Sequence, residues 1–361
     1  MRLSISLLLA GICLPASLHA QDLGNLPQDT QDPTIVVTAS GLEQPADDTG
    51  QAVTVITRDE IQDFRSLDEA LARTPGITVA RNGGIGQTAG VFIRGAESYQ
   101  TLVLLDGVKI NDPSAPQGGV DFGQLLAGNI ARIEVLRGPS GIVWGSQAIG
   151  GVVNIVSDQP TDGFEARGRA EYGYRDSAQG FANIAGTSGI LEGSAGAGYL
   201  RTDGISAFDE NLGGTERDGY RNFTANGKLR VNLSEALSLD ARGYYIDAKT
   251  EFDGFPPPNF TLADTGDFSK NKLFVGYTGA NLALLNGQFK NRFAYTYTDV
   301  SRDNFERSGG ADVPSFLSQG KLDRFEYRGE LSPVSAVTLL FGAETELSRL
   351  DTISPAFETQ P

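Results

Sequence analysis

The spacing of hydrophobic and polar positions divides the chain near residue 160. From residue 164 onward apolar and polar side chains alternate, which is the period of a half-buried strand. In the first such segment, one face carries small and aromatic residues and the other carries charges: Ala166, Gly168, Ala170, Tyr172 and Tyr174 against Glu165, Arg167, Arg169 and Glu171. One apolar and one charged face is typical of a wall between lipid and a wet lumen.

The alternation predicts about nine strands, over 164–175, 178–187, 190–201, 220–232, 236–249, 271–284, 288–301, 321–331 and 336–349. Short turns at 187–189, 233–235, 286–287 and 332–334 alternate, after the first hairpin, with long loops at 202–219, 250–270 and 302–320. This alternation favours a transmembrane antiparallel β-barrel over the alternative of a soluble β-sandwich. Single-chain bacterial barrels have an even number of strands, so we expect a truncated barrel, with nine of roughly 22 strands present.

Residues 50–160 follow a different pattern and predict a compact α+β domain. Strands are expected at 52–56, 77–79, 91–95, 101–108, 130–136 and 150–156. A helix is expected over 67–73 and a short one over 122–126. Thr57 with Glu60, and Ser66 with Glu69, have the spacing of capping boxes. About 100 residues form a domain small enough to sit inside a barrel of ~22 strands.

The N-terminus reads as a secretory signal peptide over residues 1–20, with an apolar run over 3–14 and Ala20 before the expected cleavage site. The only cysteine and the only histidine, Cys13 and His19, lie within it. The mature chain therefore lacks the residues for disulfides, thiolate chemistry, histidine triads and most zinc sites. The net charge of −16 makes the chain a poor nucleic-acid binder.

A short apolar stretch over 34–39 stands alone in the polar segment 21–49. Ile35, Val36 and Val37 are β-branched and favour a strand, yet nothing around them is apolar enough to cover it. Such a tethered strand can pair with the sheet edge of another protein. The alternative is that it forms an ordinary first strand of the following domain.

Several motifs together resemble the TonB-dependent outer-membrane receptor family, and within it the cobalamin (vitamin B12) transporters. Residues 34–39 (Thr-Ile-Val-Val-Thr-Ala) resemble the TonB box, while 92–95, 104–107, 133–139 and 145–155 resemble the plug signature. The resemblance implies a signal peptide at 1–20, a TonB-box segment at 21–49, a plug at 50–160 and an incomplete barrel at 161–361. It also implies that the protein is not an enzyme.

The implied function is energy-coupled uptake of a large, scarce nutrient across the outer membrane, most simply cobalamin or a related corrinoid. An iron-siderophore receptor of the same family is the alternative, and a barrel adhesin or enzyme is a distant one. The implied partners are the inner-membrane TonB complex, outer-membrane lipid and an extracellular corrinoid or metal chelate. The residues expected to bind TonB are Thr34, Ile35, Val36, Val37, Thr38 and Ala39.

The resemblance also assigns site residues. The positions that contact ligand in cobalamin transporters correspond to Thr88, Gly90, Glu97, Ala115, Pro116 and Phe252, although nearly all differ in type from those transporters. Structural calcium is expected between two external loops, held by Glu216, Asp218, Asp253 and Asp264; Ser206 stands where the family has an aspartate, and Asp209 is a possible substitute. The alternative is that these are solvated acidic loops.

Arg94 and Arg137 lie in the plug signature and resemble residues that lock the plug to carboxylates of the barrel wall. Glu165 and Glu171 are the partners that the predicted strand faces suggest. The alternative is pairing inside the plug, for instance with Glu134.

Overall fold

The computed structural model describes residues 35–36, 44–45, 50–160, 162–308, 310–334 and 337–354. The predicted signal peptide at 1–20 and the TonB-box residues Thr34, Val37, Thr38 and Ala39 lie outside this range. The two described residues of the box form strand β1 (Ile35–Val36), which pairs with β2 (Gln44–Pro45) and not with the domain that follows. The alternative that this stretch is the first strand of that domain is therefore wrong.

The domain at residues 50–160 contains a five-stranded mixed sheet in the order β3-β8-β9-β6-β7. Its strands are β3 (Ala52–Thr57), β6 (Thr101–Leu105), β7 (Val108–Lys109), β8 (Ile130–Arg137) and β9 (Gly151–Ser157). A separate hairpin joins β4 (Ile77–Arg81) to β5 (Ala89–Ile93). The α-helices are α1 (Arg58–Ile61), α2 (Leu67–Leu71) and α3 (Gly141–Trp144), and the 3₁₀ turns are η2 (Ser98–Gln100), η3 (Pro116–Gly118) and η4 (Phe122–Gln124).

Two local predictions for this domain need correction. The predicted strand over 101–108 is broken by a tight turn, because Asp106 and Gly107 both adopt positive φ (49° and 78°), as Asp-Gly pairs in hairpins favour. Thr57 and Glu60 do form a capping box, with the Thr57 amide donating to Glu60 at 2.7 Å. Glu69 instead accepts from the amide of Arg65 at 3.1 Å, one residue before the predicted cap.

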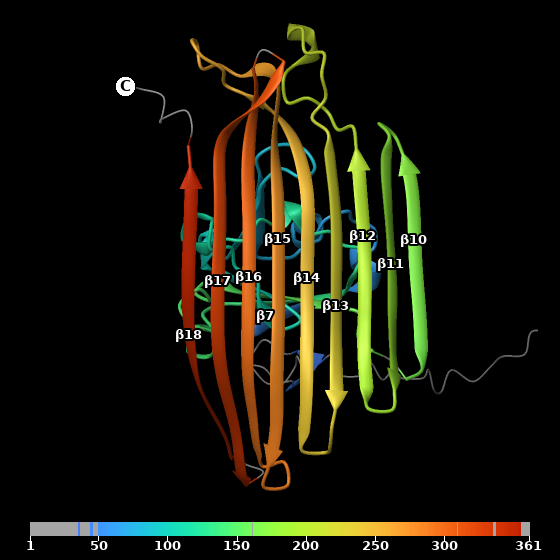
Figure 1. Cartoon of the computed structure of the whole chain (residues 1–361), viewed down its shortest axis with the longest axis vertical. Helices are drawn as coiled ribbons and strands as arrows, with labels where there is room; N and C mark the ends of the chain where they lie inside the picture. Colours follow the sequence, from blue (N-terminus) through green and yellow to red (C-terminus); the bar gives the residue numbers. More distant parts are fainter. Residues whose placement is uncertain are drawn as a thin grey trace, which may run out of the picture.

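The nine predicted strands of the second half are all present and form one antiparallel sheet, each strand pairing with the next (Figure 1). They are β10 (Phe164–Gly173), β11 (Ser177–Ser188), β12 (Leu191–Thr202), β13 (Tyr220–Asn232), β14 (Leu237–Gly254), β15 (Ala263–Leu284), β16 (Phe289–Ser308), β17 (Ala311–Val334) and β18 (Val337–Ile353). Within the described chain, β10 and β18 are the two edges. No helix in the described part is long and apolar enough to cross a membrane.

The predicted long loops at 250–270 and 302–320 are mostly strand. β14 and β15 run on to leave only 255–262 between them, and β16 ends at Ser308, close to the start of β17 at Ala311. Backbone pairing needs no apolar face, so a ladder can continue where alternation in the sequence has stopped. The extension is reinforced by Phe268 of β15, which stacks on Phe305 of β16 with ring centroids 4.8 Å apart. Only the loop at 203–219, with η5 (Glu210–Leu212), is as long as expected.

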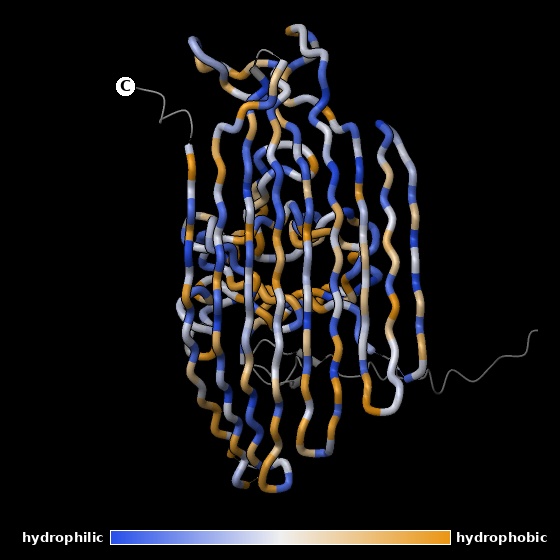
Figure 2. The backbone as a smooth tube through the Cα atoms, viewed as in Figure 1, coloured by the Kyte–Doolittle hydropathy of each residue, from blue (hydrophilic) through white to orange (hydrophobic). Residues whose placement is uncertain are grey.

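The α+β domain, the plug, lies against one face of the nine-stranded sheet, the wall (Figures 1 and 2). A continuous apolar core joins Ile110 and Phe122 of the plug to Tyr244, Ile246 and Val275 of the wall. The predicted faces of β10 are confirmed, because Arg167 and Arg169 reach the plug, where Arg169 donates to the carbonyl of Gln62 at 2.7 Å.

Gly86 shows how closely plug and wall approach. It has a φ of +80°, and a Cβ built on it would lie 2.1 Å from the Tyr220 ring of β13. Its carbonyl accepts from Gln124 at 2.6 Å and from Thr250 of β14 at 3.0 Å. The position requires both the small size and the backbone freedom of glycine.

We expect Gly86→Ala to destabilise the packed plug by about 2 kcal/mol or more, from left-handed backbone strain and the clash with Tyr220. Gly84→Ala, in the same loop but with open space at its Cβ, is the matched control and should stay within about 0.5 kcal/mol. Urea unfolding in detergent micelles, followed through the single and buried Trp144, measures both. Equal stability of the two variants would contradict the close approach.

Candidate functional site

The tight turn at Asp106 is one point where several contacts fix the plug to the wall. Lys228 of β13 pairs with the Asp106 carboxylate at 3.3 Å and donates to the carbonyl of Ser157 at 3.4 Å. Arg242 of β14 donates to the Asp106 carbonyl. The carboxylate also accepts from the Ser157 amide and hydroxyl, at 3.0 and 2.6 Å. One plug residue therefore holds two wall cations and the end of β9.

A second junction centres on Asp158, whose side chain is 4% exposed. Its carboxylate pairs with Arg58 of the plug and, at 2.5 Å, with Arg167 of β10. Its carbonyl accepts from the Ser194 hydroxyl of β12 at 2.7 Å. A buried carboxylate is tolerated only when charges and hydrogen bonds compensate it, and here each partner comes from a different element.

Two further ion pairs complete the junction toward β18. Asp112 of the plug pairs with Arg302 of β16 at 2.5 Å. Lys109 of the plug pairs with Glu344 of β18 at 2.6 and 2.8 Å. In this pair the plug supplies the cation and the wall the carboxylate, the opposite of the other junctions.

The predicted lock between Arg94 or Arg137 and the carboxylates of β10 is not formed in the described structure. Arg137 donates to the Pro75 carbonyl at 2.7 Å and to the Thr54 hydroxyl at 2.9 Å, both within the plug. Arg94 is exposed, and its amide bonds the Gly76 carbonyl at 3.0 Å. Glu165 and Glu171 pair instead with their own strand neighbours Arg167 and Arg169. The suggested alternative partner Glu134 pairs with Arg132 and Asn154.

The predicted ligand-contact residues are partly gathered. Gly90 of β5 lies beside η2, where a Cβ on it would be 3.4 Å from the Ser98 hydroxyl, and Glu97 caps η2. η2 in turn neighbours η3, which carries Pro116 and follows Ala115. Thr88 is exposed on the loop between β4 and β5, whereas Phe252 lies on β14 opposite Asp267. The structure thus groups Gly90, Glu97, Ala115 and Pro116, and it places Thr88 and Phe252 apart from them.

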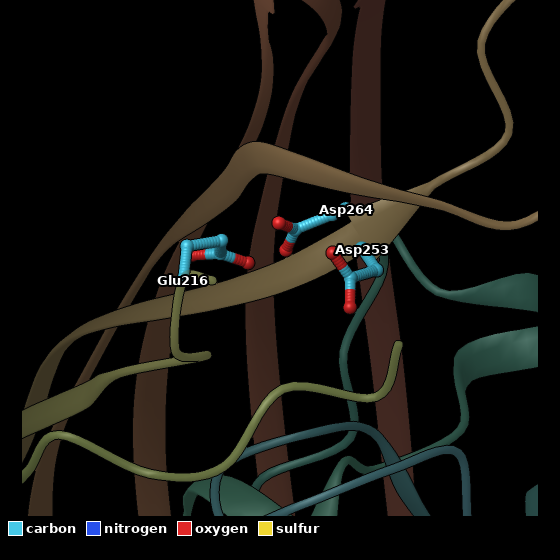
Figure 3. Close-up of side chains that lie close together, drawn as sticks. All are labelled: Glu216, Asp253 and Asp264. Atoms are coloured by element: carbon cyan, nitrogen blue, oxygen red, sulfur yellow. The ribbon is translucent and has the colours of Figure 1, made fainter. Parts of the chain in front are cut away.

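Three of the four predicted calcium ligands meet. One oxygen each from Glu216, Asp253 and Asp264 lies within 4.8 Å of the other two (Figure 3). Glu216 comes from the loop 203–219, and the aspartates lie on β14 and β15. Asp253 is buried and accepts from the Phe208 amide at 2.7 Å and the Thr265 amide at 2.9 Å. Backbone amides thus fix this carboxylate in place.

The electrostatics of this acidic cluster favour a cation. Burial, followed by repulsion from Asp218, raises the pKa of Glu216 to about 7. Burial and the charge of Asp253 raise the pKa of Asp218 to about 6, against a lowering bond from the Ala207 amide. Each of Glu216, Asp218 and Asp264 also has one buried oxygen with no hydrogen-bond partner in the described structure.

The donor set fits calcium. Calcium takes oxygen ligands at about 2.3–2.6 Å, so oxygens on one ion lie at most about 5 Å apart, as these do. Asp218 lies beside the cluster and bonds the Ala207 amide at 2.8 Å. Ser206 donates to Asp253 at 2.9 Å, whereas the expected substitute Asp209 accepts from Asn211 within its own loop.

Residues 45–152 match the family described as the TonB-dependent Receptor Plug Domain. Among solved structures, the chain resembles the siderophore receptor PiuA from Acinetobacter baumannii (16% identity, TM-score 0.66, 86% of this chain and 47% of that one). It also resembles the ferric yersiniabactin uptake receptor FyuA from Yersinia pestis (20%, 0.64, 85% and 50%). A third match is the ferripyoverdine receptor of the outer membrane of Pseudomonas aeruginosa (17%, 0.68, 88% and 45%).

The chain spans about half the length of these receptors. At these identities the likeness shows the fold: a plug followed by antiparallel strands of a TonB-dependent receptor barrel. The plug match and the shared fold together support the expected relation of this chain to the TonB-dependent receptor family. The particular closeness to cobalamin transporters expected from the motifs is not shown.

Proposed function

We propose that this chain is the plug and part of the barrel of an outer-membrane receptor that takes up a ferric siderophore, driven by the TonB complex. The three structural neighbours named above are receptors for siderophores or their ferric complexes, which supports this cargo over the corrinoid that the motifs suggested. The signal peptide and the lipid-suited outer face of the strands support the outer membrane as the site of action.

The observation that carries the proposal is the way the plug sits on the wall. Besides its apolar contact, it is held by ion pairs and hydrogen bonds at Asp106, Asp112 and Asp158. Once a pull opens the interface, water solvates these charges again, and this solvation offsets part of the ion-pair energy that is lost. A plug held in this way can be rearranged by a pull without unfolding the wall.

The pull would enter through the TonB box. Ile35–Val36 lies outside the plug sheet and pairs only with the two residues of β2 among the described residues. Because this ladder is only two residues long, few hydrogen bonds would have to break before Ile35–Val36 pairs with a strand of TonB.

Val36→Pro should reduce retention of the chain by the purified periplasmic domain of TonB by at least about 10-fold, because proline removes an amide donor and disfavours a paired strand. Asn25→Pro, in the same tether but outside the box, should bind as the parent does. Retention of both variants at the parental level would count against docking through the box.

Cargo is tested by titrating the refolded chain in micelles with ferric siderophores of the hydroxamate and catecholate classes and with cobalamin. We expect saturable binding of a ferric siderophore and none of cobalamin. Quenching of Trp144 fluorescence, with the metal-free siderophore as control, provides the measurement. Binding of cobalamin alone would contradict the proposed cargo.

Cobalamin remains the second candidate because of one observation, the acidic cluster shared by the loop 203–219 and strands β14 and β15. The resemblance to cobalamin transporters predicted calcium at these residues. We propose that Glu216, Asp253 and Asp264 hold calcium and thereby fasten the loop to the two strands. Bound calcium would neutralise the negative charges of these carboxylates and remove the repulsion between them.

Calcium affinity should rise with pH, because Glu216 and Asp218 must lose their protons and their pKa values are raised to about 7 and 6. Without calcium the sign reverses: a raised carboxyl pKa means that stability falls as pH rises from about 4.5 to about 7. Isothermal titration at pH 5.5 and pH 8 measures the first effect, and hydrogen exchange of the loop measures the second.

Glu216→Gln should weaken calcium binding by about 10-fold or more and flatten the pH dependence, since it removes one charged ligand. Asp209→Asn, in the same loop but outside the cluster, is the matched control and should behave as the parent does. Equal affinity of the two variants would show that the cluster is a solvated acidic loop.

A further inference from the structure

Four cations stand in one row across four adjacent strands. Arg201 of β12 lies opposite Arg221 of β13, Arg221 lies opposite Lys249 of β14, and Lys249 lies opposite Lys270 of β15. These strands lie inside the sheet, away from its edges β10 and β18 (Figure 1). Side chains directly opposite one another are about 5 Å apart at Cβ, and like charges in such positions destabilise a sheet.

The row is on the outer face of the wall. Leu200 and Thr202, which flank Arg201, are buried, whereas Arg201 is exposed. Thr250, the residue after Lys249, points to the plug and donates to the Gly86 carbonyl. Because successive side chains of a strand point to opposite faces, the cations point away from the plug. They are thus separate from any path through the lumen.

The level of the row is that of lipid headgroups. One step down the strands, two residues nearer the middle of the sheet, the outer face carries Tyr199 opposite Phe223 on β12 and β13, and the ion pair of Asp247 and Lys272 on β14 and β15. Phe223 in turn contacts Tyr245 of β14, with ring centroids 6.4 Å apart. Aromatic side chains mark the membrane interface in outer-membrane barrels. The cations lie about 7 Å beyond them, toward the loop 203–219.

The charge of the row is only partly balanced. Lys249 pairs with Glu251 at 2.5 Å, and Arg201 pairs with Asp176. Arg221 has no ion-pair partner in the described structure, and Lys270 rests over the rings of Phe268 and Phe305 instead of a carboxylate.

The row lines a cavity of about 710 Å³, into which the loop 203–219 adds Arg217. Five cations face three carboxylates there, so the cavity is positive although the chain as a whole carries a net charge of −16. Because the carboxylates of the cavity do not balance this positive charge, the cavity is suited to an anion from outside the protein.

We infer that this row binds the phosphate groups of a phosphorylated glycolipid in the outer leaflet. A phosphate between opposite cations would turn their mutual repulsion into attraction, and arginine offers several donors to its oxygens. The acyl chains would continue down the aromatic and apolar outer face below. The inference rests on the proposed membrane placement of the wall but not on the cargo that the receptor carries.

The test uses the full chain in micelles and native mass spectrometry, with lipid A, a glycolipid bearing two phosphates, as the probe. We expect the chain to retain lipid A but neither its dephosphorylated form nor inorganic phosphate. Arg221→Gln with Lys270→Gln should weaken retention about 30-fold, the loss expected for two cations at a lipid surface.

The matched control is Lys272→Gln with Lys321→Gln, which removes the same charge from the same face. Each of these lysines already has a carboxylate partner, Asp247 at 3.7 Å and Asp299 at 3.8 Å. We expect retention within about twofold of the parent, because such surface pairs contribute little to the field outside.

Equal losses in the two double variants would overturn the assignment, as would equal retention of the dephosphorylated lipid or of inorganic phosphate. Insertion into vesicles, measured by protection of the wall from protease, separates this failure from that of the membrane proposal. A chain that inserts but does not distinguish the phosphorylated lipid overturns only the lipid site. A chain that fails to insert overturns both.

Discussion

The plug is held on the wall by charges that neither part could bury alone. Asp106 and Asp158 are almost enclosed, and removing Lys228 or Arg167 would leave each carboxylate short of a partner in a poorly solvated interface. The same cations, without the plug, would face a wet lumen. The charged residues of the plug and of the wall therefore compensate one another in only one arrangement. The position of the plug follows from which wall residues point inward.

The inward set is fixed by the two-residue period of the strands, which is why so much of the wall could be predicted from the sequence. The alternation of 164–175 assigned Arg167 to the inner face, and its contact with Asp158 confirms it. Strand ends were less predictable. The paired segments before Ser308 and after Ala311 carry no alternating pattern, because backbone pairing holds a hairpin together even where neither of its faces is apolar.

Some candidate site residues could be predicted from the sequence, and others could not. Glu216, Asp253 and Asp264 were assigned through the resemblance to cobalamin transporters, and they meet in the structure because neighbouring loops of a meander lie at the same end of the sheet. Lys228 and Asp106 lie 122 residues apart, and their pairing depends on how the plug is seated, which no local pattern records. Arg137 was assigned to the wall, yet its two terminal nitrogens donate to Pro75 and Thr54 inside the plug. The Asp-Gly turn at 106–107 was the available signal, since it projects a carboxylate from the end of a buried strand.

The proposed uptake would require the plug to move against the wall, and a covalent tether between them tests that requirement directly. A Cβ on Gly320 of β17 would lie 3.1 Å from the Cβ of Ser114 in the plug, somewhat closer than the roughly 3.5–4.5 Å of a disulfide, so the two backbones must move slightly apart to accept the bond. The only native cysteine, Cys13, lies in the predicted signal peptide, so Ser114→Cys with Gly320→Cys adds one defined pair. In cells carrying the receptor of which this chain is the proposed plug and part of the barrel, the oxidised pair should bind cargo normally but take up none, and a reductant should restore uptake. Equal uptake in the oxidised and reduced states, with each single variant as control, would contradict a moving plug.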